Sequence, residues 1–551
     1  MKKRNLTMKK STFIKGALIT TLGVIFTKII GIIYVIPFHA LIGEKGGALY
    51  GYAYTIYTIF VSLASAGIPL AISKLVSEYQ ALGYYNVKKR VFFLAKRLSV
   101  LLGVICFFVM LIFAPLLAKL ILGDISGGNS LKDVVLVIRV ISSAILVVPL
   151  LGVYRGYFEG HRFMSPPSIS QVLEQLIRVF IIILGSFFAL KVFKFDLTTT
   201  VGVALFGATV GALISYFYLL NKKKNNESKF NERVRDVNEP IITNKVIIKK
   251  ILIYGFPFIM IDIFKSMYNY IDLVNVVKGL VKYADFSVTD AEVIYSMLST
   301  WGQKFNMIIF SISTGIIVSL IPSLTESFVK KDNVEVDKKT TQAFNMLLFL
   351  IIPMTLGISF LSKAIWTLFY GNSLYGPSVL SYYIFAGLFI ALFTCMITSL
   401  QVLKDYKMVL LSLISGVLVK AIFNNNFISS FYQIGLPPYY GIITATIFGY
   451  VISTVICMLT LYKKYNIKFK NCLNYFVEMM IGALLMIIVL FIISLLIPIY
   501  SKIRIVNLFI IIFYACIGAF VYFLYAYKSN LMKNIFGNAF INKIKNIILK
   551  K

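Results

Sequence analysis

The chain has 551 residues, of which 59% are hydrophobic and 14% charged, and its 55 Lys and Arg against 22 Asp and Glu give a formal net charge of +33. An ordinary soluble protein, in which about a quarter of the residues are charged, is excluded. In a soluble chain this basic balance would suit nucleic acid, but in a membrane protein Lys and Arg collect in cytoplasmic loops. We therefore expect a polytopic membrane protein without a nucleic-acid partner.

Apolar stretches long enough to cross a bilayer fill the chain almost from end to end. A span needs ~20 apolar residues to cross ~30 Å of hydrocarbon, and a helix satisfies its own backbone there. The pattern predicts an all-α protein with fourteen transmembrane helices. The expected spans are residues 15–40, 50–73, 94–121, 132–153, 166–190, 198–220, 250–277, 296–324, 341–362, 377–399, 407–424, 438–462, 474–499 and 504–527.

The connecting segments set the expected topology. With the amino terminus inside, Lys and Arg gather in the loops on that side, which predicts that both termini are cytoplasmic. Residues 221–249 are polar and basic and are expected to form a flexible cytoplasmic linker between six spans and eight. The basic tail, residues 528–551, has apolar residues at helical spacing. It is either a short amphipathic helix on the inner leaflet or a solvated cytoplasmic tail.

Ionisable residues inside the predicted spans are the candidate functional groups. Each costs at least ~2.5–3.5 kcal/mol in hydrocarbon, so each is expected to face a partner or a wet cavity. Glu174 and Arg178 are four residues apart and Asp262 and Lys265 are three apart, so each pair shares a helix face. Both pairs are open to interpretation as neutralised structural pairs. The other members of the set are Lys28, Arg139, Lys304 and Asp272.

Setting the two pairs aside leaves three cations against one carboxylate. The interior is therefore biased positive, which suits an anionic substrate such as a diphosphate, because low-dielectric walls strengthen the field. We expect Lys28, Arg178, Lys265 and Lys304 to bind substrate in a cavity. Glu174, Asp262, Arg139 and Asp272 are expected to pair helices or to act in gating. Arg139 and Lys304 lie near the outer ends of their spans, where snorkelling to the interface is the competing interpretation.

No enzyme signature occurs in the sequence. There is no P-loop, HExxH or GxSxG motif, and five scattered cysteines with two distant histidines indicate neither a disulfide framework nor a metal site. The residues alone thus predict a secondary transporter or flippase of an anion, without a cofactor or an ATPase subunit. The membrane potential, worth ~2.3 kcal/mol per charge per 100 mV, is the expected driving force, with a monovalent cation as a candidate for resetting the carrier.

One motif resembles a known family. Residues 154–179 read YRGYFEGHRFMSPPSISQVLEQLIRV. This stretch resembles the YRGYFQG…P…SQVxEQxxRV signature of the polysaccharide flippases in the MOP superfamily, and more narrowly the group of stage V sporulation protein B and Gram-positive MurJ-type lipid II flippases. Weaker similarities, at residues 49–57, 66–79, 302–304, 321–323 and 400–404, extend the resemblance from the first span to about the twelfth.

The resemblance implies two six-helix lobes, residues 1–220 and 250–462, around a central cavity. It also implies two carboxyl-terminal helices, within residues 463–527, that form a lipid-facing groove. Such a protein moves an undecaprenyl-diphosphate-linked glycan, lipid II in the MurJ type, across the bacterial plasma membrane by alternating access. By the same resemblance Lys28 matches a basic cavity position, and Glu174 and Arg178 match the EQxxR motif. The sequence departs from the pattern at Val35, where a basic residue is expected.

Two other functions remain open at this point. A flippase of another lipid-linked polysaccharide unit has nearly the same sequence requirements. A MATE-type multidrug antiporter needs carboxylates to exchange a cation for a cationic drug. The first predicted span offers Lys28 and no carboxylate, which argues against the antiporter.

Overall fold

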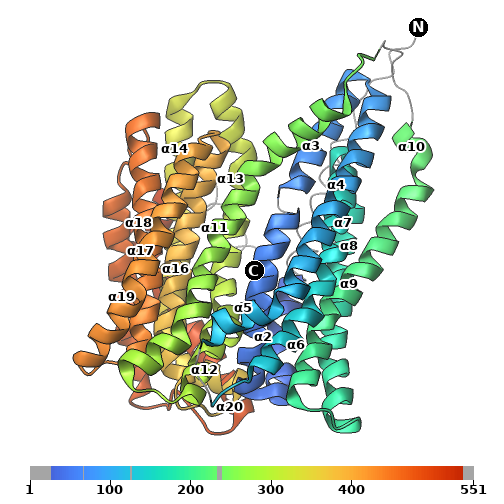
Figure 1. Ribbon diagram of the computed structural model, residues 1–551. Coiled ribbons are helices and arrows are strands. Elements are labelled where there is room, and N and C mark those ends of the chain that lie inside the picture. Colours follow the sequence, from blue (N-terminus) through green and yellow to red (C-terminus); the bar gives the residue numbers. More distant parts are fainter. Residues whose placement is uncertain (1–26, 66, 124–126, 232–238, 538–551) are drawn as a thin grey trace. The chain divides into compact units, whose positions relative to one another are not determined.

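The computed structural model describes residues 27–65, 67–123, 127–231 and 239–537, and all regular elements in these ranges are helical (Figure 1). Twelve helices in this part of the chain are long and apolar enough to cross a membrane. The expected all-α, multi-pass membrane fold is thereby confirmed. Fourteen spans remain a prediction, because residues 15–26 of the first expected span lie outside the described residues and the expected seventh span is not among the twelve.

The chain divides into two compact units, Met1–Val274 and Asn275–Lys551. The division falls inside α11 (Asn244–Ala284), the 41-residue helix that follows the connector. The amino-terminal part of α11 therefore packs with the first unit, whereas the sequence analysis assigned residues 221–249 to the linker and the span from residue 250 on to the second lobe.

The first unit begins with helical residues 27–33 and continues through a series of mostly long helices. Its elements before α11 are α2 (Val35–Ser65), α3 (Ile68–Leu82), α4 (Tyr85–Ile112), α5 (Ala114–Leu122), α6 (Leu131–Ser142), η1 (Ser143–Leu146), α7 (Val148–Gly160), α8 (Ser165–Phe180), η2 (Ile181–Gly185), η3 (Phe188–Val192), α9 (Leu197–Asn225) and α10 (Glu227–Asn231).

Two glycines mark breaks in the first helices. Gly43 has φ 62° and ψ −165°, so α2 consists of two helices that meet at a kink. Gly67 has φ 76° and precedes α3; a Cβ atom there would lie 2.2 Å from the carbonyl oxygen of Gly255 in α11. Only glycine combines a left-handed conformation with so close a backbone approach.

Prolines start several helices inside the expected spans. Pro115 stands in the first turn of α5, so the expected third span, 94–121, is interrupted after Ile112. Pro149 stands in the first turn of α7, after the short 3₁₀ helix η1 has interrupted the expected fourth span. Because proline lacks an N–H donor, it is tolerated where a helix begins and breaks a longer helix there.

The expected flexible linker is anchored at both of its described ends. Phe230 of α10 is 2% exposed and packs against the rings of Tyr157, Phe158 and His161. The buried Lys88 Nζ donates to the carbonyl oxygen of Phe230 at 2.7 Å. Beyond residues 232–238, the Glu239 carboxylate accepts from the first backbone N–H groups of α4 at 2.9–3.1 Å. The aromatic rings around Phe230 and the cap at the start of α4 thus attach the described parts of this connector to the first unit, and a flexible linker stays a prediction.

As far as residue 537, where the described part of the chain ends, the second unit contains the carboxyl-terminal part of α11 and ten further α-helices. Its elements after α11 are α12 (Val288–Ser296), η4 (Met297–Trp301), α13 (Gln303–Val329), α14 (Asn333–Phe360), α15 (Ser362–Tyr370), α16 (Gly376–Val402), α17 (Tyr406–Gln433), α18 (Pro438–Tyr465), α19 (Cys472–Ser494), α20 (Arg504–Lys528) and α21 (Leu531–Phe536). Helices α16, α17 and α18 pack side by side within it (Figure 1).

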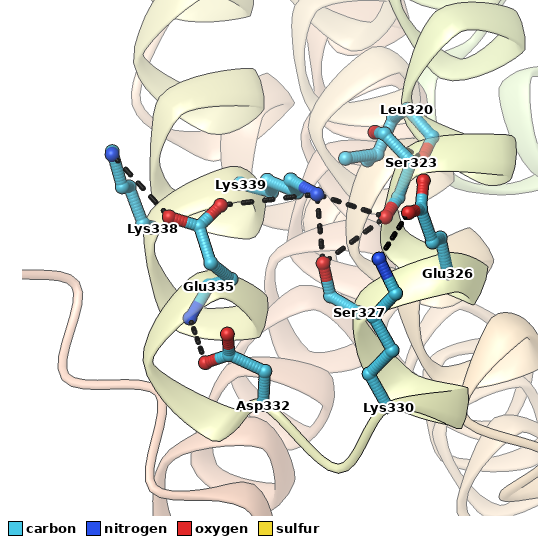
Figure 2. Close-up of polar contacts among 9 residues, drawn as sticks. All are labelled: Leu320, Ser323, Glu326, Ser327, Lys330, Asp332, Glu335, Lys338 and Lys339. Atoms are coloured by element: carbon cyan, nitrogen blue, oxygen red, sulfur yellow. Dashed lines mark hydrogen bonds and ion pairs between the residues drawn. The ribbon is translucent and has the colours of Figure 1, made fainter.

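A lysine joins α13 to α14 beside the turn between them. Figure 2 shows Lys339 Nζ of α14 reaching the Ser323 carbonyl oxygen at 3.1 Å and the Ser327 hydroxyl at 2.7 Å, both in α13. The Asp332 side chain caps α14 by accepting from the Glu335 N–H at 3.0 Å. The turn is thus held by a side-chain cap and a cross-helix ammonium.

The expected amphipathic tail is described only in its first part. Helix α21 buries Leu531 and Ile535, and Ile535 accepts at its carbonyl from the Gln342 side chain of α14. Residues 538–551 lie outside the described residues. The described part of the tail therefore packs on protein.

Candidate substrate-binding site

The candidate site of the first unit is built on one face of α8. Two prolines in the first turn start this helix, and Ser170, Glu174 and Arg178 then follow at intervals of four residues. Such spacing places the three side chains in one row along the helix. Helix α8 packs against α7 and α9 (Figure 1).

Small residues of α9 let α8 come close. A Cβ atom on Gly211 would lie 2.7 Å from the Glu174 carbonyl oxygen, and one on Gly207 would lie 3.1 Å from that of Arg178. The Ser215 hydroxyl of α9 donates to the Ser170 carbonyl oxygen at 2.9 Å. Small residues at such a contact are the usual way in which membrane helices approach each other. These contacts set the position of Glu174 and Arg178 relative to α9.

The Glu174 carboxylate lies between two guanidinium groups. Its Oε2 accepts from Arg155 Nη2 of α7 at 2.8 Å, and its Oε1 accepts from Arg178 Nη2 at 2.5 Å. Arg155 Nε also donates to the Ser170 hydroxyl at 2.8 Å. The three ionised side chains are only 15–18% exposed. The group, which we call the α8 cluster (Arg155, Ser170, Glu174 and Arg178), thus carries one positive charge in excess.

Tyrosines of α2 stand next to the α8 cluster. The Arg178 guanidinium interacts electrostatically with Tyr50, Tyr54 and Tyr57. The rings of Tyr50 and Tyr54 are stacked, with centroids 5.6 Å apart. The Arg178 Nε is buried and has no hydrogen-bond partner among the described residues. The excess positive charge leaves the cluster able to attract an anionic group, while the hydroxyl-bearing rings suit a polar head group.

Lys28 lies in the helical stretch 27–33, which approaches α8 at Gly31. A Cβ atom on Gly31 would lie 3.7 Å from the Gln175 side-chain nitrogen of α8, and Lys28 stands three residues before Gly31. Residues three apart share a helix face, so Lys28 faces the same side as this contact. Its side chain is half-buried. Val35, where the family pattern expects a basic residue, is fully buried.

The remaining predicted site residues lie on three other helices, α6, α11 and α13. On α11 the Asp262 side chain is exposed, and Lys265 and Asp272 are half-buried. Asp262 and Lys265 interact electrostatically, without a hydrogen bond between their described side chains. Arg139 of α6 is exposed and forms no ion pair with a described residue. Lys304, half-buried at the start of α13, belongs to the second unit. The cavity and gating roles predicted for these residues remain predictions.

Two charged residues of interest were missed by the sequence reasoning. Arg155 lay two residues beyond the expected end of its span, but α7 continues to Gly160 and brings it to Glu174. The arginine of the YRGYFEG motif was the signal that could have found it. Lys420 lies inside an expected span, and the structure buries it completely on α17. Nothing in its local sequence pairs it with an acid.

A third feature is an apolar cavity of about 340 Å³ in the second unit. Its walls come from α14, α15, α19 and α20, with Pro353, Met486 and Tyr522 among the lining residues. The two last membrane helices thus enclose space beside α14 that suits hydrocarbon.

Taken together, a two-unit membrane bundle with buried, net-positive charge is the architecture of a secondary transporter. The fold is similar to a solved structure described as the lipid II flippase MurJ in an inward closed conformation, with TM-score 0.68 and 15% identity, covering 94% of this chain and 100% of that one. It is also similar to an inward-facing MATE multidrug resistance transporter of the MOP superfamily, with TM-score 0.62 and 12% identity, covering 80% and 94%. These similarities define the fold class, which the two kinds of transporter share.

The sequence comparisons are more specific. Residues 13–328 match the model of the polysaccharide biosynthesis protein family, and the chain belongs to this family. The lipid II flippase MurJ of Bacillus subtilis is 30% identical over 538 residues, which cover 96% of this chain and 97% of that protein. Stage V sporulation protein B of the same organism is 30% identical over 212 residues, covering 38% and 39%. The family expected from the EQxxR motif is thereby confirmed.

Proposed function

We propose that this protein is a flippase that moves lipid II, an undecaprenyl-diphosphate-linked peptidoglycan precursor, from the inner to the outer leaflet of a bacterial plasma membrane. The observation that carries the proposal is the 30% identity to the Bacillus subtilis lipid II flippase over 96% of this chain. The net-positive α8 cluster supports it, because a diphosphate needs a cationic partner that a drug cation does not.

The α8 cluster suits the first contact with the diphosphate. Arg178 carries a positive charge beside the tyrosines of α2, and Glu174 holds its guanidinium in place. Arg155, anchored on Ser170, keeps the carboxylate from cancelling the whole positive charge. Bidentate geometry favours arginine over lysine for phosphate recognition. In this proposal Arg178 binds and Glu174 and Arg155 position it.

The sugars and the other basic residues complete the proposed cycle. Tyr54 and Tyr57 beside Arg178 are suited to stack on sugar rings or to hydrogen-bond their hydroxyls. Lys28, Lys265 and Lys304 are proposed to supply further positive charge along the path, and Asp262, Asp272 and Arg139 to pair helices as the carrier changes state. No catalytic step is part of the proposal.

The proposed energy source is the membrane potential. An outside-positive potential favours outward movement of an anion by ~2.3 kcal/mol per charge per 100 mV. A monovalent cation is proposed to reset the empty carrier. The lysines at one end of the second unit, including Lys330, Lys464 and Lys528, support a cytoplasmic location for that end and for the carboxyl terminus. Unchanged flipping in cells after collapse of the potential would contradict this driving force.

The function is tested by complementation. The chain is expressed in a bacterium depleted of its own lipid II flippase, beside Arg178→Ala, Lys28→Ala and, as a control outside the proposed site, the exposed Lys330→Gln. We expect rescue by the parent and by Lys330→Gln, and loss of rescue for Arg178→Ala and Lys28→Ala at equal membrane abundance. Failure of a well-inserted parent would reject lipid II and direct the search to another lipid-linked polysaccharide. Rescue by Arg178→Ala would remove the α8 cluster from the site.

A further inference from the structure

A π turn interrupts one of the membrane-crossing helical runs of the second unit. The run Val288–Val329 consists of α12, η4 and α13, and η4 (Met297–Trp301) is its π-helical part. The Gly302 N–H donates to the Met297 carbonyl oxygen, five residues earlier, at 2.6 Å. Single π turns of this kind are rare and occur frequently at functional sites. Lys304, one of the lysines proposed to supply charge along the substrate path, follows η4 directly.

Two features hold the π turn in place. The Trp301 carbonyl oxygen accepts from the Tyr370 hydroxyl of α15 at 3.0 Å. The Phe305 N–H, which would reach this carbonyl in a regular α-helix, donates to the Gly302 carbonyl oxygen at 3.0 Å instead. Gly302 provides the necessary space, because a Cβ atom there would lie 2.5 Å from the Met297 carbonyl oxygen. The Tyr370 hydroxyl thus replaces the backbone donor that the π turn displaces.

Buried polar groups beside the π turn are unsatisfied. Asn306 of α13 is 6% exposed, and its Oδ1 and Nδ2 have neither a hydrogen-bond partner among the described residues nor surface that water could reach. A Cβ atom on Gly387 of α16 would lie 2.5 Å from this Oδ1. Trp366 Nε1, whose ring lies 4.9 Å from that of Tyr370, is also buried without a described partner. Such groups are costly, so their presence calls for a second arrangement of this helix that relieves them.

Movement of the π turn along the helix would provide this second arrangement. The turn holds one residue more than an α turn, so each residue that it passes rotates about the helix axis by one helical step, ~100°. Residues 302–306 come next along the helix. Their rotation would carry the Asn306 amide away from Gly387 and would turn Lys304 to a different side of α13.

We propose that η4 is a movable π turn that sets the direction of Lys304 during transport, and that Tyr370 is the positioning residue that holds the turn where this structure has it. When the Tyr370 bond to the Trp301 carbonyl breaks, the turn moves toward α13 and Lys304 rotates with it. The contact of Lys304 with substrate rests on the proposed function, whereas the movement of the π turn does not.

Fluorine NMR of the full chain, labelled with fluorotryptophan and held in lipid nanodiscs, tests the proposal. The chain has two tryptophans, Trp301 and Trp366, both beside η4, and Trp366→Phe assigns their signals. We expect two signals for Trp301, one for each position of the turn. Tyr370→Phe should raise the ratio of the second signal to the first about fivefold. Tyr514→Phe, which removes the bond of another buried tyrosine to the Ile497 carbonyl oxygen, is the matched control and should give the parent's ratio.

A second variant should move the same equilibrium in the opposite direction. Asn306→Leu replaces the unsatisfied amide by an apolar group of similar shape, which favours the position of the turn seen here. We expect the ratio of the signals to fall about fivefold, the melting temperature to stay equal or rise, and complementation to weaken. A residue with a purely structural role would not slow transport without loss of stability.

The outcomes separate this proposal from the proposed function. A single Trp301 signal in the parent and both variants, or the parent's ratio in Tyr370→Phe, overturns the movable turn. A lower melting temperature for Asn306→Leu also overturns it, because the amide would then stabilise the present arrangement. Full complementation by Asn306→Leu overturns the role in transport. If the parent does not complement but the signals shift as expected, lipid II is rejected and the movable turn stands.

Discussion

The helix pairs α8–α9 and α17–α18 handle buried charge in different ways. Both pairs pack through glycines: Gly211 meets the backbone of Glu174, and Gly441 meets the backbone of Phe427. In the first pair the carboxylate of Glu174 sits between two arginines. In the second, α17 buries Lys420 completely, and Asn424, one turn away, has no described hydrogen-bond partner. The same kind of helix contact therefore encloses an ion-paired row in one unit and a buried lysine followed by an asparagine in the other.

This comparison separates contacts that the local sequence predicts from contacts that it does not. The spacing of four residues predicts the pairing of Glu174 and Arg178, whereas Lys420 has no acid at helical spacing on α17. Its burial follows from the close approach of α18, where the Ser453 hydroxyl donates to the Ser412 carbonyl oxygen at 2.8 Å and Gly441 touches Phe427. A buried charge is expected to be functional by default, so Lys420 belongs beside the α8 cluster in future mutagenesis.

The largest loss of stability is expected when the carboxylate of the α8 cluster is removed. Glu174→Gln leaves Arg155 and Arg178 buried without their counter-charge, and we expect a loss of about 3–5 kcal/mol in the free energy of unfolding, with loss of complementation. Thermal unfolding in detergent measures it. The double variant Glu174→Gln/Arg155→Gln should recover part of the stability. A single variant as stable as the parent would show that the ion pairs do not hold the cluster together.

The next largest effect is expected from the glycine contacts. Gly441→Ala would place a Cβ atom 2.5 Å from the Phe427 backbone, and Gly211→Ala would place one 2.7 Å from that of Glu174. Overpacking of this kind costs about 1–3 kcal/mol. Gly315→Ala, with nothing within 4 Å of the new atom, is the matched control. Equal melting temperatures for all three variants would mean that the helices separate without penalty.

The stability of the first unit is expected to depend on pH through His161, which lies outside the predicted spans. Burial, with Lys88 and Lys223 nearby, lowers the pKa of His161 to about 4. The unfolded chain, with a pKa near ~6.5, then binds a proton that the folded chain does not, so stability is complete above about pH 6.5 and falls between ~6.5 and ~4. We expect a loss of about 1–2 kcal/mol over this window, after allowing for partial exposure.

The unfolding temperature of the parent and of His161→Gln, measured from pH 7.5 to 4.5, checks this prediction. The variant should lose most of the slope between pH 6.5 and 4.5. The chain has one other histidine, His39, so His39→Gln serves as the control and should keep the slope. A slope that persists in His161→Gln would assign the pH dependence to carboxylates.

The smallest expected effect concerns the turn of Figure 2. Lys339→Met removes the ammonium that bonds the Ser323 carbonyl oxygen and the Ser327 hydroxyl, and we expect a loss of about 1 kcal/mol. The neighbouring Lys338 is 71% exposed, so Lys338→Met should change stability by less than ~0.5 kcal/mol in detergent without anionic lipid. Chemical unfolding of the two variants in parallel distinguishes them. Equal effects would mean that the cross-helix bonds contribute nothing.

By itself the sequence determined the class of the molecule and the core of the candidate site. Apolar stretches of membrane length can only be helices in lipid, and the i, i+4 spacing of Glu174 and Arg178 is enough to place both side chains on one helix face. The EQxxR motif identified the family that the comparisons confirm. These features are local, and local periodicity is what a sequence displays directly.

Only the tertiary structure brought Arg155 to Glu174, buried Lys420 against α18 and anchored Phe230 of the linker in an aromatic cage. Each of these contacts joins residues that are far apart in the chain. Which residues meet depends on how neighbouring helices are aligned along their length. Glycine contacts and proline breaks set that alignment, and a single stretch of sequence does not show which neighbouring helix they meet.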